Sequence, residues 1–189
     1  QMTLLVIGLL LFLGGHLLRV VAPGMRENMI ARLGPWGWKA VYSIPALAGF
    51  VLMVIGYDAA RWTSPVLWNS PPWTRMVATL AMAPVLVIFV SAYLPGKIRD
   101  GLRHPMLLAT ILWAVVHLMA NGRVADLVLF GSILAWAVVV AIAAWRRPWR
   151  PTAGPNGPVF DLVAVLVGVA AWMILIRGGH VWLVGMPVS

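Results

Sequence analysis

Residues 127–145 read LVLFGSILAWAVVVAIAAW, a stretch of apolar side chains without a charge. A lipid bilayer accepts a helix of about 20 such residues, because the helix satisfies its own backbone hydrogen bonds while its side chains meet hydrocarbon. Further apolar stretches, charged only near their ends, occupy residues 3–21, 40–57, 76–96, 105–122 and 159–176. The sequence therefore predicts an all-α fold, a polytopic membrane helical bundle with about six transmembrane helices.

The composition supports a membrane location for the whole chain. Of the 189 residues, 62% are hydrophobic and 10% are charged, against roughly 45–50% and 25% in soluble domains. We find no internal repeat, so residues 1–189 are expected to form a single integral membrane domain. Cysteine is absent, which excludes disulfides and thiolate ligation of iron.

The net charge of +9 is explained by topology rather than by a nucleic-acid partner. Ten of the fourteen Lys and Arg residues follow the first, third and fifth apolar stretches. Because positive charges gather in cytoplasmic loops, these three loops are expected to face the cytoplasm. The protein would then be multi-pass with both termini outside, and its first helix would be retained rather than cleaved as a signal peptide.

The positions of the carboxylates argue against hydrolase chemistry. All of them are expected in loops or at helix ends, so no pair can be placed within the bundle as an acid and a base. The five are Glu27, Asp58, Asp100, Asp126 and Asp161.

Two histidines, His16 and His117, fall inside apolar stretches, where a polar side chain is by default a functional candidate. On the helix predicted for residues 105–122, Trp113, His117 and Asn121 are spaced by four and share one face, so Asn121 could orient the imidazole or meet a ligand. Haem iron is one ligand that could explain two such histidines. Arg19 follows His16 by three residues and could then pair with a propionate of the haem. A structural alternative stays open, in which each histidine only bonds a neighbouring helix.

A second histidine motif, Arg103-His104-Pro105, precedes the same helix. Pro105 suits an early helical position, where its missing N–H costs nothing. Arg103 and His104 are counted with the candidate cofactor-binding residues, although topology and contact with lipid headgroups explain the basic cluster around them better.

Several of these segments together resemble the NnrU family: FLGGHLLR at residues 12–19, RHP at 103–105, WAVVH at 113–117 and NG at 121–122. The resemblance covers most of the chain. This bacterial family is similar to the plant 15-cis-ζ-carotene isomerase, an integral membrane enzyme that uses haem b. The resemblance implies a protein of the bacterial inner membrane in which His16 and His117 occupy the positions of the haem-ligand histidines, hold the iron and thereby carry catalysis.

The resemblance also implies a reaction, the haem-dependent cis–trans isomerisation of a carotenoid-like polyene. Reduced iron would lower the bond order of one double bond, and a hydrocarbon substrate needs no acid or base. The alternative is a bis-His haem protein that passes electrons to a redox partner in nitrite or nitric oxide reduction during denitrification. In a third possibility the protein binds no cofactor and assists assembly. The Arg-His-Pro motif alone also resembles membrane methyltransferases, but no acidic residue follows Asp161 to complete their cofactor site.

Overall fold

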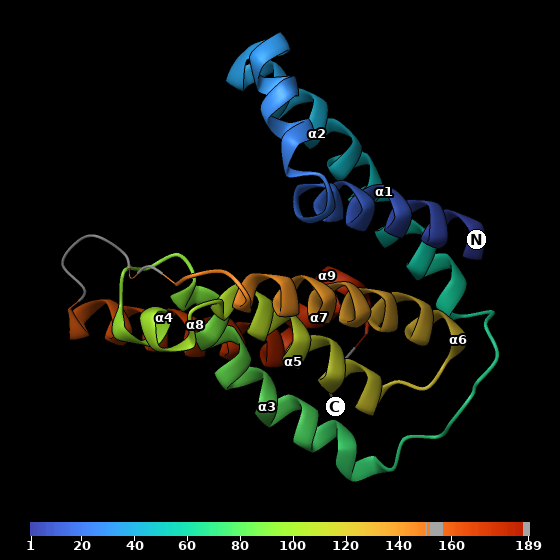
Figure 1. Cartoon of the computed structure of the whole chain (residues 1–189). Coiled ribbons are helices and arrows are strands. Elements are labelled where there is room, and N and C mark those ends of the chain that lie inside the picture. Colours follow the sequence, from blue (N-terminus) through green and yellow to red (C-terminus); the bar gives the residue numbers. More distant parts are fainter. Residues whose placement is uncertain (150, 152–156, 187–189) are drawn as a thin grey trace. The chain divides into compact units, whose positions relative to one another are not determined.

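The computed structural model describes residues 1–149, 151 and 157–186, without the side chains of residues 18–21 and 23. Within these residues the chain is helical and contains no strand. The helices form two compact units (Figure 1). Unit 1 comprises Gln1–Leu67 and Arg123–Trp136, and unit 2 comprises Trp68–Gly122 and Ala137–Ser189. The expectation of a single domain stays a prediction.

Every apolar stretch named above lies in or largely within a helix. The longer helices are α1 (Met2–Val21), α2 (Pro23–Arg61), α3 (Pro72–Ser91), α5 (Pro105–Ala120), α7 (Ser132–Trp145) and α8 (Pro158–Ile174). Shorter elements are α4 (Lys97–Leu102), α6 (Val124–Asp126), α9 (His180–Val184) and the π-helical turns Leu127–Gly131 and Leu175–Gly179. The prediction of an all-α fold is therefore confirmed for the described residues.

The number of spans is not confirmed. Among the described residues, four helical segments are long and apolar enough to cross a membrane: Gly24–Arg61, Pro72–Ser91, Val124–Trp145 and Pro158–Val184. Two more, Met2–Leu17 and Pro105–Ala120, are apolar but shorter. Sixteen residues in α5 extend about 24 Å at 1.5 Å per residue, less than the roughly 30 Å of a typical hydrocarbon core.

Helix α2 begins well before residue 40, where its apolar stretch begins. Pro23 occupies its first turn, and the backbone leaves helical dihedral angles at Gly34, with φ of 72°. Hydropathy locates the part of a helix that can enter lipid, whereas residues 23–33 form a polar helical segment that hydropathy does not reveal. Glycine suits the break because it adopts positive φ without steric cost.

Unit 1 is built on the close packing of α1 against α2 (Figure 1). A Cβ added to Gly8 would collide with the backbone of Met53, and one added to Gly56 would collide with Leu5. A Cβ on Gly49 would lie 2.7 Å from the Phe12 nitrogen. Glycines thus let the two backbones approach closely along the length of an antiparallel pair, as small residues do in membrane helices.

In unit 2, α3 packs against both α5 and α8. Gly168 of α8 meets Val87 of α3, where an added Cβ would lie 2.6 Å from the Val87 Cα. Farther along α8, Trp172 Nε1 donates a hydrogen bond of 2.7 Å to the Thr79 carbonyl of α3. Because residues 168 and 172 meet residues 87 and 79 in reverse order, α3 and α8 are antiparallel. This places the end of α3 and the start of α8 at the same end of the unit.

Candidate functional site

His16 lies in α1, in an aromatic environment within unit 1. Its ring centroid is 4.7 Å from that of Phe12, 5.4 Å from Tyr42 and 5.9 Å from Trp136. The ring is half-buried, and Nδ1 lies 2.6 Å from the Phe12 carbonyl oxygen. The Phe12 contact and the Nδ1 hydrogen bond both come from one helical turn earlier in the chain.

His117 lies in α5, in unit 2, in a local arrangement of the same form. Its ring centroid is 4.8 Å from that of Trp113, and Nδ1 lies 2.8 Å from the Trp113 carbonyl oxygen. The ring planes meet at 43°, against 47° for Phe12 and His16. Each histidine therefore follows by four residues an aromatic residue that both contacts its ring and accepts its hydrogen bond.

These hydrogen bonds fix the tautomer of both imidazoles. A backbone carbonyl only accepts, so Nδ1 carries a proton in each ring, and in the neutral form of the imidazole Nε2 carries the lone pair. Metal-binding histidines use this arrangement, in which the N–H donated to a carbonyl orients the ring and raises the basicity of the other nitrogen. The donor set of His16 and His117 is thus chemically suited to axial ligation of iron.

Trp136 is a neighbour of His16 that sequence reasoning missed. Its indole Nε1 is buried and has no hydrogen-bond partner among the described residues, and its ring meets that of His16 edge to face, at 85°. A buried N–H without a partner costs about 1–3 kcal/mol. The sequence carries no signal for this contact, because residues 16 and 136 are far apart in the chain and tryptophan is common in this protein.

The other residues expected near the two histidines have these positions. Arg19 belongs to α1, but its side chain lies outside the described residues. Trp113 contacts His117, as its spacing suggested. Asn121 ends α5, and its Nδ2 donates a hydrogen bond of 2.9 Å to the His117 carbonyl oxygen rather than to the imidazole. The roles of these residues toward a cofactor stay predictions.

Arg103 and His104 form the connection between α4 and α5. The Arg103 backbone has φ of 60° and ψ of −51°, and the His104 nitrogen donates to the Leu102 carbonyl at 2.6 Å. These values define a γ-turn of the rare kind with positive φ, which costs about 1–3 kcal/mol for a residue other than glycine. The His104 ring lies beside Trp145 and Trp149, with centroids 6.0 and 5.6 Å away.

A buried polar cluster in unit 1 was not expected from the sequence. Asp126 is 4% exposed, and its carboxylate accepts hydrogen bonds of 2.8 Å from the Tyr57 hydroxyl and from the Arg123 backbone N–H. Arg61 is also buried and pairs with Asp58 at 2.6 Å. The cluster fastens the end of α2 to the start of α6, residues that are 69 positions apart. The expectation that every carboxylate lies at a helix end or in a loop holds for Asp126, but that position is not solvated.

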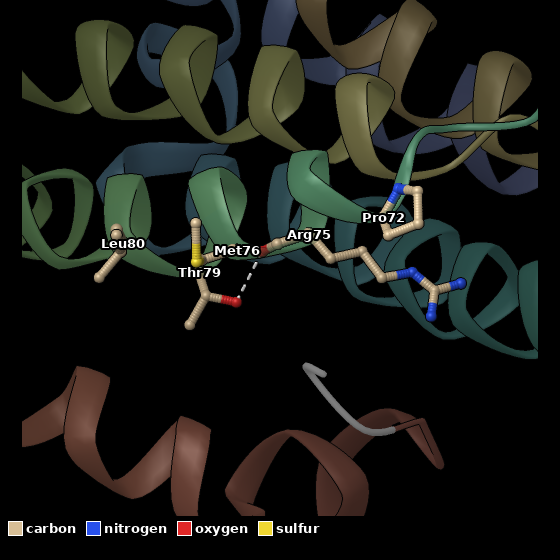
Figure 2. Close-up of a pocket in the computed structure, with 5 residues that line it drawn as sticks. All are labelled: Pro72, Arg75, Met76, Thr79 and Leu80. Carbon is tan, nitrogen blue, oxygen red and sulfur yellow. Dashed lines mark hydrogen bonds between the residues drawn. The ribbon is translucent and has the colours of Figure 1, made fainter.

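No group of three or more His, Asp or Glu side chains that could hold a metal ion occurs in the described part of the chain. A shallow apolar pocket lies along the start of α3, lined by Pro72, Arg75, Met76, Thr79 and Leu80 (Figure 2). It contains none of the residues singled out from the sequence. The histidines consequently remain the candidate ligands for a cofactor.

The described residues define an all-helical protein with helices long and apolar enough to span a membrane. It carries two half-buried imidazoles in matched local settings. A family model described as NnrU protein matches residues 4–188. The chain belongs to the NnrU family, which confirms the resemblance noted in its motifs. No match was found among curated proteins or among solved structures.

Proposed function

We propose that this protein binds haem b through His16 and His117 and isomerises a cis double bond of a carotenoid-like polyene in the bacterial inner membrane. The observation that carries the proposal is the matched setting of the two imidazoles, each with Nδ1 held by the carbonyl four residues earlier, at 2.6 and 2.8 Å. A ligand pair needs two oriented rings that present Nε2, and a local hydrogen bond supplies that orientation in each helix.

The surroundings of His16 add a second line of support. The unpartnered Nε1 of Trp136 would gain an acceptor from a polar group bound beside the imidazole. Arg19, one turn beyond His16, would supply positive charge for a propionate at the end of α1. Trp113 would position His117 by ring contact, and Asn121 would position it through the backbone carbonyl that it binds.

The proposed isomerisation needs a bound haem and an apolar setting, but no acid, base or cysteine. A bound haem b would supply an iron that can share electron density with a polyene. The aromatic side chains around His16 provide an apolar setting, and a hydrocarbon offers nothing to protonate or hydrolyse. Because the chain has no Cys, any exchange of an axial ligand must use Met, another His or an open position.

The ligand assignment is tested by the absorption spectrum of the detergent-solubilised protein from haem-replete cells. We expect a Soret band that is lost or displaced in His16→Ala and in His117→Ala. The matched control is His180→Ala, since His180 lies near the C-terminus with Nδ1 bonded to the Met186 carbonyl, and this variant should keep the spectrum. A colourless wild-type protein, or unchanged spectra in both ligand variants, would refute the assignment.

Electron transfer is the second candidate function, and the equal anchoring of both imidazoles favours it. If His16 and His117 both stayed bound to a haem, the iron would suit the transfer of electrons toward nitrite or nitric oxide reduction and would leave no position for a substrate. Carbon monoxide separates the two functions. Binding to the reduced protein, together with conversion of 9,15,9′-tri-cis-ζ-carotene in a carotenoid-producing host, supports isomerisation, whereas an inert reduced spectrum supports electron transfer.

A further inference from the structure

One end of unit 2 carries a concentration of positive charge. We call it the basic end and define it by Lys97, Arg99, Arg103, Arg146 and Arg147. Arg99 is half-buried and the other four are exposed. These positions lie within α4 or next to the ends of longer helices, namely the end of α3, the start of α5 and the end of α7. The charges are therefore found at the ends of membrane helices.

The acidic residues near the basic end do not neutralise it. Asp161, at the start of α8, accepts hydrogen bonds of 3.1 and 3.0 Å from the backbone nitrogens of Lys97 and Ile98. Its carboxylate therefore serves as the cap of α4. Asp100, half-buried within α4, is the second carboxylate here. Five cations against these two carboxylates leave the basic end with an excess of positive charge.

His104 joins two segments of the basic end. Its ring meets Trp145 and Trp149 edge to face, at 79° and 80°. This contact holds His104, next to Arg103 in the chain, beside the segment that contains Arg146 and Arg147. The indole of Trp145 is 42% exposed, as expected for a side chain in the headgroup layer of a bilayer.

The backbone at Arg103 has positive φ where the chain turns from the end of α4 to the start of α5. Glycine would adopt φ of 60° without cost, yet the chain places an exposed arginine there. Unfavourable backbone conformations persist mainly where a side chain is needed in that position. The turn thus places an exposed arginine, rather than the glycine that would fit it best, at the junction of α4 and α5.

We propose that the basic end binds the phosphate headgroup of an anionic phospholipid, with Arg103 and His104 at the centre of the site. Charge complementarity selects an anion, and the exposed tryptophan at the ends of membrane helices selects a lipid as its source. A guanidinium donates two parallel hydrogen bonds to phosphate oxygens, and the imidazole offers one more donor.

Native mass spectrometry of the full-length protein in detergent measures the binding directly, with phosphatidylglycerol and phosphatidylcholine as probes. We expect preferential retention of phosphatidylglycerol. Arg103→Gly should weaken that retention about five-fold, which is the effect of one cation near an anionic surface. Arg103→Lys should keep most of it, and added salt should weaken it because exposed charges are screened.

The variant Arg103→Gly also separates binding from folding, because glycine relieves the positive φ. Its thermal midpoint without lipid should be no lower than that of the wild type, so that weaker binding cannot be attributed to unfolding. Arg75→Gln is the matched control: Arg75 lies at the opposite end of α3, and its loss removes the same charge while leaving the preference for phosphatidylglycerol intact.

Three results would overturn the proposal: equal retention of both lipids, undiminished phosphatidylglycerol binding in Arg103→Gly, or an equal loss in Arg75→Gln. Thermal stabilisation by millimolar inorganic phosphate, to the same extent as by phosphatidylglycerol, would assign the site to a soluble anion instead. None of these measurements depends on a cofactor, so failure here is distinguishable from failure of the haem proposal.

Discussion

At the scale of single residues, several polar side chains in apolar surroundings are satisfied by a nearby partner. Among the described residues, the buried atoms Arg61 Nε, Ser70 Oγ and Trp136 Nε1 have none. His16 and His117 use a carbonyl of their own helix, and Asp126 uses Tyr57 and a backbone N–H. This pattern follows from the cost of burying a polar group without a hydrogen bond. Trp136 Nε1 departs from it, which is why its position beside His16 bears on function.

The Tyr57–Asp126 hydrogen bond gives a prediction about stability. Tyr57→Phe removes one donor and should lower the free energy of unfolding by about 1–2 kcal/mol. Asp126→Ala leaves both the Tyr57 hydroxyl and the Arg123 N–H without an acceptor and should cost about 2–4 kcal/mol. Thermal or denaturant unfolding of the detergent-solubilised protein measures both values.

The matched control for this prediction is Glu27→Ala, because Glu27 is an exposed carboxylate of the same unit. Its effect should stay within about 0.5 kcal/mol, as for most surface substitutions. If Asp126→Ala were as mild as Glu27→Ala, the buried cluster would not hold α2 to α6.

At the scale of elements, close approach rather than interlocking of large side chains brings the helices together. Gly8 of α1 and Gly49 and Gly56 of α2 face the partner backbone, as does Gly168 of α8. Lipid is as apolar as a protein core, so association in a membrane depends on van der Waals contact between close backbones. The position of each glycine, rather than the number of glycines, therefore determines the pairing.

Two glycines of α1 predict effects of opposite sign. Gly8→Ala would place a methyl group against the Met53 backbone and should destabilise the protein by about 1–3 kcal/mol as α1 and α2 separate. Gly14→Ala has no atom within 4 Å of the new Cβ and should stabilise the helix by about 0.5–1 kcal/mol. Thermal midpoints that shift in the same direction for both variants would contradict this packing.

At the scale of the whole molecule, unit 2 bears on the number of spans. The Trp68 backbone N–H donates to the Gly122 carbonyl at 3.2 Å, so the end of α5 lies beside the start of α3. The beginning of α5 follows α4, and α4 in turn follows the end of α3. If α3 crosses the membrane, α5 must return across it despite its sixteen residues. In that case either the bilayer would have to become thinner around α5, or residues flanking α5 would have to lengthen its span.

Single cysteines can locate the two ends of this unit, because the protein has no Cys of its own. Asn69→Cys and Gly101→Cys introduce thiols at exposed positions in the loop before α3 and in α4. A membrane-impermeant maleimide applied to spheroplasts should label Asn69→Cys, and should label Gly101→Cys only after the membrane is opened. Labelling of both from the same side would refute the crossing of α3 and α5 and the expected cytoplasmic location of the basic end.

The sequence by itself determined the class of the protein, because the need for apolar helices in lipid is a property of composition along the chain. It also singled out His16 and His117, and the spacing of four that joins Trp113 to His117, because a helical period places such residues on one face. The motifs around these histidines were enough to identify the family.

Only the tertiary structure decided what depends on residues that are distant in sequence. Hydropathy is insensitive to the helical segment before residue 40 and to the break at Gly34 that separates it from the rest of α2. Three contacts join residues from separate segments of the chain: Tyr57 with Asp126, Trp136 with His16, and Trp145 with His104. Helical periodicity determines which side chains of one helix lie on the same face. Which residues of another helix contact that face depends on how the helices pack.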